Sequence, residues 1–351
     1  MDIHKQFTQG VGLIGIANAL VSASGIVLLP LLTKNLPATG YGYYVQVVTT
    51  VALLSVPLTL GLPIVLVRFV ALNKEQEHIK ADFYSIMFVT VLMNIIASCV
   101  LLLLSRSVAD FLFGGSVIIA AILPIIILFA SFNLLLLDYF RAFTQIKRYS
   151  LFYVAQTYLG LAFTSFFIFA GYGTVGAVLG FLVGQVVVFA IMLSIVVANI
   201  GIGLPRFAQM RTYLSFSVPL IPGSLSFWVV NSSDRYLIGI FLGASYVAYY
   251  SPSYALGMII IMFSMPIAMM LPAIMSKHFD DNELILVEKT LRYSSKYFLA
   301  LAVPTTVFLS FFSKQINPLE AHFLKLKELC RFISKDFLLH LSASEIFLLS
   351  R

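Results

Sequence analysis

A few ionisable side chains stand inside or at the ends of long apolar segments, and these are the residues with which the chain could do chemistry. Asp234 and Arg235 are followed by 41 residues without a charge. Asp138 and Arg141 stand three residues apart, so on a helix they share a face and can form an ion pair. Arg68 ends a further apolar run. Ionisable residues in such surroundings usually mark the path of an ion or a charged substrate.

The same residues also have plainer interpretations. Asp234 and Arg235 do not face each other on a helix, so each could neutralise a neighbour on another helix. Asp138 and Arg141 could mark a membrane interface, where aromatic residues gather. Arg68 could extend its guanidinium into lipid headgroups.

Uncharged polar residues inside the apolar segments could contact a substrate or form hydrogen bonds between helices. They are Asn18, Gln46, Asn94, Asn133, Gln156, Gln185 and Asn231. Asn231 is the favoured substrate contact, because it stands three residues before Asp234 on the same predicted helical face.

The spacing of charges defines the elements that carry these residues. Between Arg148 and Arg206 lie 57 residues without Asp, Glu, Lys or Arg, and shorter charge-free segments recur along the chain. The chain is 60% hydrophobic and only 11% charged, whereas a typical soluble domain is about 25% charged. A bilayer core needs about 20 apolar residues per helix. These charge-free segments therefore predict an all-α polytopic membrane protein.

We expect about nine transmembrane helices. They cover residues 10–33, 43–67, 83–105, 117–140, 151–170, 176–198, 212–240, 246–275 and 295–313. Residues 1–200 are predicted to form a six-helix lobe, and 201–314 a partial second lobe of about three helices. Prolines in three of these helices interrupt backbone hydrogen bonding and provide bend points. They are Pro57, Pro63, Pro219, Pro222, Pro266 and Pro272.

Lys and Arg fix the expected orientation, because short cytoplasmic loops hold the excess of these residues. Over alternate segments between the predicted helices, one side carries thirteen Lys and Arg and the other at most four. We therefore expect a multi-pass protein of the cell (inner) membrane with a cytoplasmic N-terminus.

Several other classes of protein are disfavoured. The two cysteines, Cys99 and Cys330, form neither a disulfide framework nor a zinc cluster. The basic residues are scattered through short loops, so nucleic acid is not an expected partner. The sequence has no phosphate-cradling P-loop, so ATP is not the expected direct energy source. We expect no cofactor.

Two loops of similar sequence indicate an internal repeat. Residues 36–44 read LPATGYGYY and residues 242–250 read LGASYVAYY, and paired prolines follow each of them. Parallel repeats of this kind are typical of two-lobed transporters.

Several strings, in order, resemble the polysaccharide-export proteins, or O-antigen flippases, of the multidrug/oligosaccharidyl-lipid/polysaccharide exporter superfamily. They are residues 32–37 with 41–43, 60–62 with Arg68, 139–142 with 146–150, and 213–222 leading to Asn231, 234–236 and 242–243. The resemblance covers roughly residues 8–315.

This resemblance implies two pseudosymmetric lobes around a central cavity, which move a lipid-linked oligosaccharide by alternating access. Its substrate would be a glycan on a polyprenyl phosphate or pyrophosphate, as in lipopolysaccharide synthesis. Arg235 or Arg68 would then meet phosphate, Asp234 could couple to a cation, and Asn231 would contact sugar. Asp138 and Arg141 complete the candidate set. Membrane lipid and other polysaccharide-assembly membrane proteins are the further expected partners.

Two alternatives stay open. One is a drug/cation antiporter of the same superfamily, against which the string at 213–236 argues. The other is a membrane-embedded glycan polymerase or ligase, which needs acids or histidines in a sizeable loop. The predicted external loops are short, with Asp110 as the clear external acid, so we expect a protein that is not an enzyme.

The chain departs from the family pattern near its end. Nine spans would place the tail, residues 315–351, outside the cell, yet this amphipathic segment carries five Lys and Arg. Either the ninth run does not fully cross the membrane, or the tail does not belong to the original architecture. A frameshift or truncation near residues 312–317 would explain the tail and would impair transport; a natural short form that pairs with another chain is the alternative.

Overall fold

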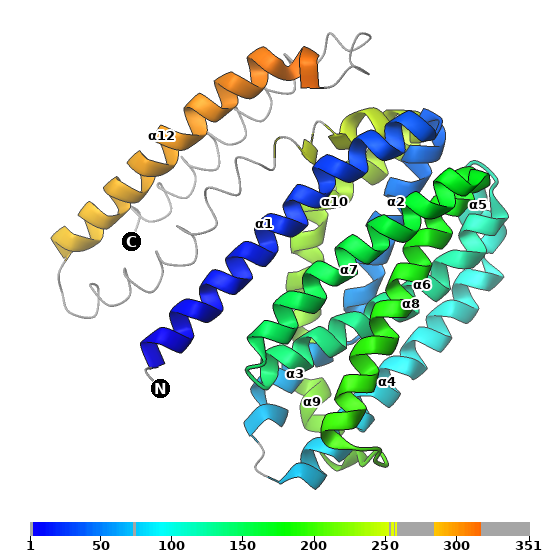
Figure 1. The fold of residues 1–351 in the computed structure, drawn as a ribbon. Helices are drawn as coiled ribbons and strands as arrows, with labels where there is room; N and C mark the ends of the chain where they lie inside the picture. Colours follow the sequence, from blue (N-terminus) through cyan, green and yellow to red (C-terminus); the bar gives the residue numbers. More distant parts are fainter. Residues whose placement is uncertain (1–2, 73–74, 253, 256, 258–283, 317–351) are drawn as a thin grey trace. The chain divides into compact units, whose positions relative to one another are not determined.

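The computed structural model describes residues 3–72, 75–252, 254–255, 257 and 284–316, and every regular element in these residues is a helix (Figure 1). The chain divides into two compact units, residues 1–248 and 249–351. The expected all-α membrane architecture is confirmed.

The first unit begins with eight α-helices that correspond to the predicted six-helix lobe. They are α1 (Ile3–Asn35), α2 (Ala38–Leu58), α3 (Leu62–Arg68), α4 (Gln76–Leu103), α5 (Ser105–Leu112), α6 (Val117–Ala142), α7 (Ile146–Phe167) and α8 (Gly173–Ile200). A linker, residues 201–206, then leads to α9 (Met210–Ser217) and α10 (Ile221–Phe241). The second unit contains α12 (Leu284–Ile316).

The described residues contain six segments that are long and apolar enough to cross a membrane, and one of them, 146–200, holds both α7 and α8. The eighth predicted helix, 246–275, lies mostly outside the described residues, and the ninth falls within α12. Apart from its first two residues, the predicted tail also lies outside them. The lobe boundary near residue 200 remains a prediction, because the first compact unit continues to Ala248.

Two helices that the sequence predicts as continuous are broken. The predicted helix 43–67 divides into α2 and α3, because Leu60 (φ 52°) and Gly61 (φ 67°) take a left-handed conformation. The predicted helix 212–240 divides into α9 and α10 at a 3₁₀ turn, Val218–Leu220. Both breaks lie beside prolines, which cannot donate a backbone hydrogen bond.

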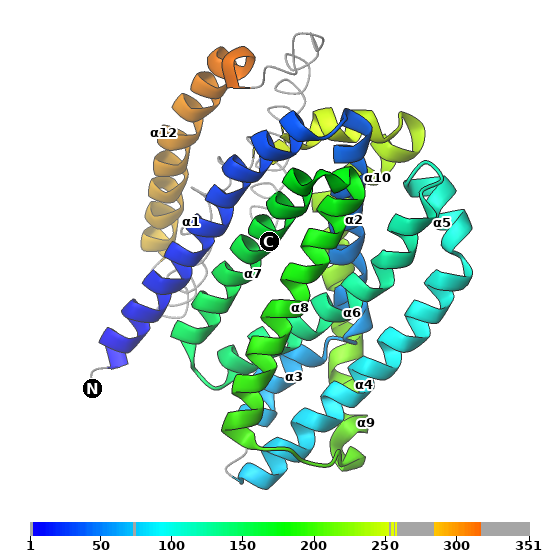
Figure 2. The ribbon, with the colours of Figure 1, turned by 45° about the vertical axis from the view of Figure 1, so that its right-hand side comes forward.

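Close packing of α7 on α8 stabilises the first lobe, and the two helices lie side by side in Figures 1 and 2. A Cβ atom at Gly180 would overlap the backbone of Thr164, and one at Gly184 would lie 2.6 Å from Cα of Gly160. In a membrane, where lipid tails are as apolar as the side chains, small residues allow the close backbone contact that drives association.

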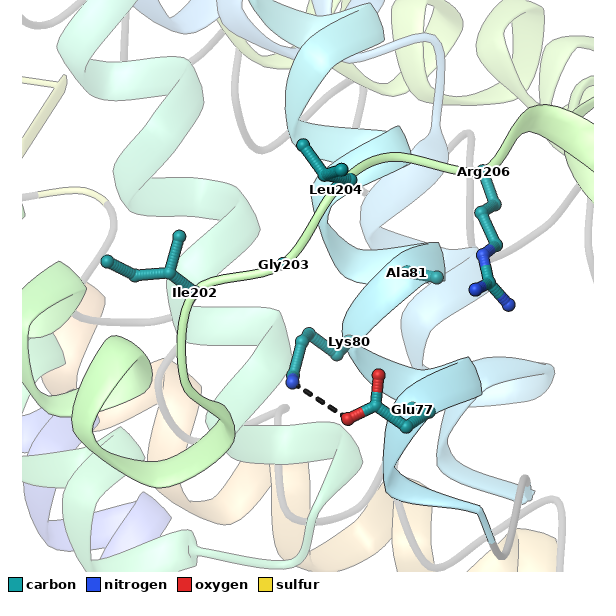
Figure 3. A pocket seen from close by; sticks show the side chains of 7 residues that line it. All are labelled: Glu77, Lys80, Ala81, Ile202, Gly203, Leu204 and Arg206. Atoms are coloured by element: carbon teal, nitrogen blue, oxygen red, sulfur yellow. Dashed lines mark hydrogen bonds and ion pairs between the residues drawn. The ribbon is translucent and has the colours of Figure 1, made fainter.

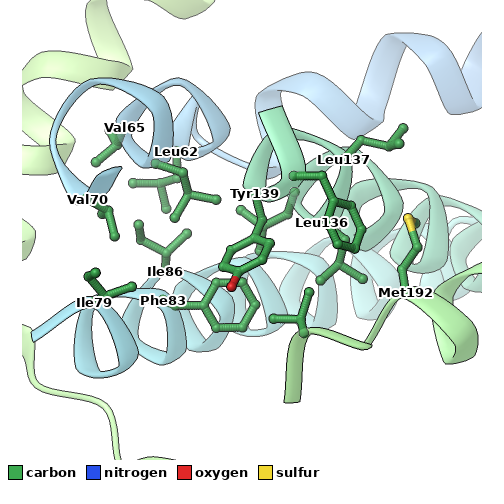
Figure 4. Close-up of a cluster of buried hydrophobic side chains, with 14 of the residues drawn as sticks. Leu62, Val65, Val70, Ile79, Phe83, Ile86, Leu136, Leu137, Tyr139 and Met192 are labelled. Carbon is green, nitrogen blue, oxygen red and sulfur yellow. The ribbon is translucent and has the colours of Figure 1, made fainter. Parts of the chain in front are cut away.

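A cluster of buried apolar side chains joins the lobe to the helix that follows it. α3 contributes Leu62 and Val65, α4 contributes Phe83 and Ile86, and α6 contributes residues that include Tyr139 (Figure 4). Met210 and Tyr213 of α9 belong to the same cluster. The start of the predicted second lobe is therefore packed into the core of the first.

Candidate functional site

α10 carries three of the candidate residues and packs along α2, and both views show the two helices beside each other (Figures 1 and 2). Small residues allow this approach. A Cβ atom at Gly42 would overlap the carbonyl oxygen of Ala244, and one at Gly239 would overlap the amide of Gln46. We call this contact the α2–α10 interface.

The α2–α10 interface is polar as well as tight. The hydroxyl groups of Thr50 and Tyr236 form a hydrogen bond across it. The ring of Trp228, the single tryptophan of the chain, meets the ring of Tyr236 edge-on with 5.5 Å between centroids. Gln46 Oε1 and Trp228 Nε1 are buried, and within the described residues neither has a hydrogen-bond partner. A buried polar atom in this condition costs about 1–3 kcal/mol.

Asn231, Asp234 and Arg235 are half-buried on α10. Nδ2 of Asn231 donates to the carbonyl oxygen of Phe227 at 2.7 Å, and Oδ1 of Asp234 accepts from the backbone N–H of Arg235 at 2.8 Å. Along α10, these three residues thus lie between Trp228 and Tyr236. Their predicted contacts with substrate remain predictions.

Arg68, at the end of α3, contacts the first segment of the predicted second lobe. Its guanidinium lies over the ring of Phe216 of α9, 4.4 Å from the centroid, and 5.7 Å from the centroid of Phe69. The two phenylalanine rings are themselves perpendicular, with 5.1 Å between centroids. Neither of the two sequence interpretations of Arg68, a phosphate contact or a contact with lipid headgroups, predicts this cation–π contact.

Asp138 and Arg141 form the ion pair that their spacing predicts, with 3.1 Å between Oδ1 and Nη2. The side chain of Asp138 is 11% exposed and that of Arg141 is 45% exposed. The pair lies on α6, away from the candidate residues of α10 in sequence, and its role in binding substrate remains a prediction.

Asp82 and Tyr213 form a contact that sequence analysis missed. The phenolic hydroxyl of Tyr213, on α9, donates to Oδ2 of Asp82, on α4, at 2.9 Å. The two residues are 2% and 6% exposed. One signal could have identified Asp82: it shares a helical face with the apolar residues Ile79 and Ile86, although it lies among the charges that begin α4.

The linker is also held against α4. The hydroxyl of Tyr84 donates to the carbonyl oxygen of Gly201 at 3.0 Å. The backbone N–H of Arg206 donates to Ser85 Oγ at 2.7 Å, and the Ser85 hydroxyl donates to the carbonyl oxygen of Arg206 at 2.9 Å. The linker therefore follows a fixed path from α8 to α9.

Most of the remaining polar candidates bond to other helices. Asn133 Nδ2 donates to Gln185 Oε1 at 2.6 Å, and Gln156 Nε2 donates to the same oxygen at 2.9 Å. Asn94 Oδ1 accepts from Ser131 at 3.2 Å. These amides join α4, α6, α7 and α8, as the plainer interpretation predicts. Asn18 is exposed on α1. Among the described residues no group of three or more His, Cys, Asp or Glu side chains could hold a metal ion.

Comparison with solved structures defines the class of fold. A MATE protein in the straight conformation matches with a TM-score of 0.62 and 16% identity, over 94% of this chain and 78% of that one. A MOP-superfamily transporter from Pyrococcus furiosus matches with a TM-score of 0.62 and 16% identity, over 92% and 75%. An outward-facing multidrug-resistance MATE transporter matches with a TM-score of 0.59 and 18% identity, over 93% and 76%. The chain has the fold of these membrane transporters.

The family is shown by sequence. A family model described as polysaccharide biosynthesis protein matches residues 7–278, so the chain belongs to this family. The resemblance inferred from the sequence strings is confirmed. Comparison with curated protein sequences gives no match.

Proposed function

We propose that this transporter flips a lipid-linked oligosaccharide, a glycan on polyprenyl phosphate or pyrophosphate, from the cytoplasmic to the outer leaflet for polysaccharide export. The observation that carries the proposal is the family match over residues 7–278, which include most of α1, all of α2 to α10 and all the candidate residues. The transporter fold supports it, because a glycan must cross the membrane before it is exported.

The chemistry of α10 suits the two ends of such a substrate. Arg235 provides a permanent positive charge for phosphate. Asn231 provides an amide for sugar hydroxyl groups, and Asp234 can take up a coupling cation. Trp228 and Tyr236 combine an apolar ring with a polar group, a combination that suits the mixed surface of a sugar.

The contacts of α2 and α3 with α9 and α10 give alternating access a physical basis. One set joins α3 and α4 to α9 through Arg68 on Phe216 and Asp82 with Tyr213. The other is the α2–α10 interface, where Gln46 and Trp228 carry unpaired buried polar atoms within the described residues. Opening this interface would hydrate those atoms and expose the polar residues of α10 to substrate.

A drug/cation antiporter is the second candidate. The observation that favours it is the structural match to multidrug-resistance MATE transporters. Asp234, an acidic residue of α10, would also suit an organic cation. An antiporter would act without any glycan substrate, and this difference separates the two functions by experiment.

The test is complementation of a host that lacks its own polysaccharide flippase. We expect surface polymer to return and lipid-linked oligosaccharide to leave the cytoplasmic face. Arg235→Ala should abolish the rescue, whereas Arg148→Gln, at an exposed residue of α7, should retain it.

Reconstitution provides the direct readout. Purified protein in liposomes that carry a polyprenyl-phosphate sugar should make inner-leaflet sugar accessible to external periodate. Efflux of a cationic dye, with no movement of the sugar lipid, would establish the antiporter and overturn the flippase proposal.

A further inference from the structure

A pocket of about 330 Å³ lies where the linker crosses the first turns of α4 (Figure 3). Glu77 and Lys80 line it from α4, and Ile202, Leu204 and Arg206 line it from the linker. None of the residues that line the pocket lies on α10, which carries the proposed transport function.

The pocket is a fixed structure, because hydrogen bonds from Tyr84 and Ser85 hold both ends of the linker. The aliphatic stem of Lys80 packs against Gly203, where a Cβ atom would overlap it. The Lys80 side chain is only 19% exposed. Its ammonium group is therefore held at the pocket wall.

The charge of the pocket favours an anion. Lys80 and Arg206 stand on either side of the Glu77 carboxylate (Figure 3). Lys80 Nζ lies 2.9 Å from Glu77 Oε1, but the Glu77 side chain is 74% exposed. An ion pair with so exposed a partner is weak, so the phosphate group of a lipid can compete with the Glu77 carboxylate for Lys80. Arg206, which lines the same pocket, adds a second positive charge.

The rim of the pocket favours a lipid as the source of that phosphate. Ile202 is 82% exposed and Leu204 is 84% exposed, although both belong to a short linker. Phe207, the next apolar residue, is 47% exposed and meets the ring of Phe88 of α4. Large exposed apolar side chains beside cations are typical of a surface that contacts lipid.

We propose that this pocket binds the phosphate headgroup of an anionic phospholipid, with the acyl chains against Ile202 and Leu204. The linker lies on the side that the excess of Lys and Arg predicts to be cytoplasmic, and anionic lipids are concentrated in that leaflet. A bound lipid would fasten the linker between the six-helix lobe and α9 to the membrane interface.

The test measures lipid binding to the purified full chain in detergent, without any transport step, so its outcome does not depend on the proposed function. Thermal unfolding is followed while phosphatidylglycerol, phosphatidylcholine or inorganic phosphate is added. We expect phosphatidylglycerol to raise the unfolding midpoint in a saturable way, and the other two to leave it unchanged. Native mass spectrometry counts the retained phosphatidylglycerol.

Variants connect the effect to the pocket. Lys80→Gln and Arg206→Gln should each weaken phosphatidylglycerol binding about fivefold, on the scale expected for one cation at a lipid surface. Glu77→Gln should strengthen binding, because it removes the competing carboxylate. Arg148→Gln, at an exposed cation outside the pocket, is the matched control.

Three results would overturn the proposal. An equal response in the Lys80, Arg206 and Arg148 variants would show that phosphatidylglycerol binds elsewhere. An equal response to inorganic phosphate would identify a free phosphate rather than a lipid. A response to phosphatidylcholine as large as that to phosphatidylglycerol would show that the charge of the headgroup has no part in binding. Because Glu77→Gln is expected to gain affinity, loss of folding cannot imitate the predicted pattern.

Discussion

Tyr213 of α9 donates its hydroxyl to the buried carboxylate of Asp82 on α4, across 131 residues of sequence. The bond joins the six-helix lobe to the first segment after the linker. The same hydroxyl lies within hydrogen-bond distance of Oε1 of Gln209, which, like Tyr213, stands at the start of the predicted second lobe. A charge-assisted bond of this kind is stronger than a bond between neutral groups.

Tyr213→Phe removes this hydroxyl and leaves the Asp82 carboxylate with one donor fewer in a buried site. We expect the free energy of unfolding to fall by about 1–3 kcal/mol, the cost of such a loss. Chemical or thermal unfolding of the purified protein measures it. Tyr84→Phe, which removes one hydrogen bond to the linker carbonyl of Gly201, is the matched control and should cost less.

Gly61 is held in a left-handed conformation at the break between α2 and α3. At φ 67° a Cβ atom would lie 2.9 Å from the carbonyl oxygen of Ser217, so Gly61→Ala meets both backbone strain and a steric contact. We expect a loss of about 1–3 kcal/mol in unfolding free energy, of the order known for such strained sites.

Two controls separate the causes at Gly61. Gly171 also has a left-handed φ (87°) but has open space around its Cβ position, so Gly171→Ala reports backbone strain alone. Gly223 has neither constraint, and Gly223→Ala should be neutral or stabilising. Equal effects at Gly61 and Gly171 would show that the contact with Ser217 contributes nothing.

The contrast between local and distant contacts explains how much of this molecule could be predicted. The spans follow from the cost of placing a charge in the bilayer, which leaves long charge-free runs in any sequence. The ion pair of Asp138 with Arg141 is confirmed because a helix brings positions i and i+3 together. The breaks at residues 59–61 and 218–220 lie among the prolines that the sequence marks as bend points.

Contacts between distant segments could not be predicted in this way. The pairing of Asp82 with Tyr213 depends on how α9 packs into the lobe, and no periodicity of the sequence records that packing. The close approach of Gly42 to Ala244, and the cation–π contact of Arg68 with Phe216, have the same origin. The candidate residues of α10 could be selected by type, but their surroundings could not.

Gly42→Ala tests whether the α2–α10 interface must open. The added methyl group would overlap the carbonyl oxygen of Ala244, so the two segments must separate. In a background with Cys99→Ser and Cys330→Ser, we expect Thr50→Cys to react faster with maleimide when Gly42→Ala is present. Gly12→Ala, where a Cβ atom meets nothing within 4 Å, is the control. An unchanged rate would mean that the interface absorbs the methyl group without opening.

Asp138 and Arg141 provide a test that separates a structural pair from a substrate site. The double variant Asp138→Arg, Arg141→Asp exchanges the two charges and should restore most of the stability that either single variant loses, because Arg141 is 45% exposed. Breaking an exposed ion pair costs about 1 kcal/mol or less. The loss should be larger here, because Asp138 is mostly buried. A purely structural pair would recover flipping together with stability in the reconstituted liposomes. Recovery of stability without recovery of sugar-lipid movement is the result expected if Arg141 meets substrate, since the exchanged carboxylate would then repel the phosphate at the position where the guanidinium attracts it.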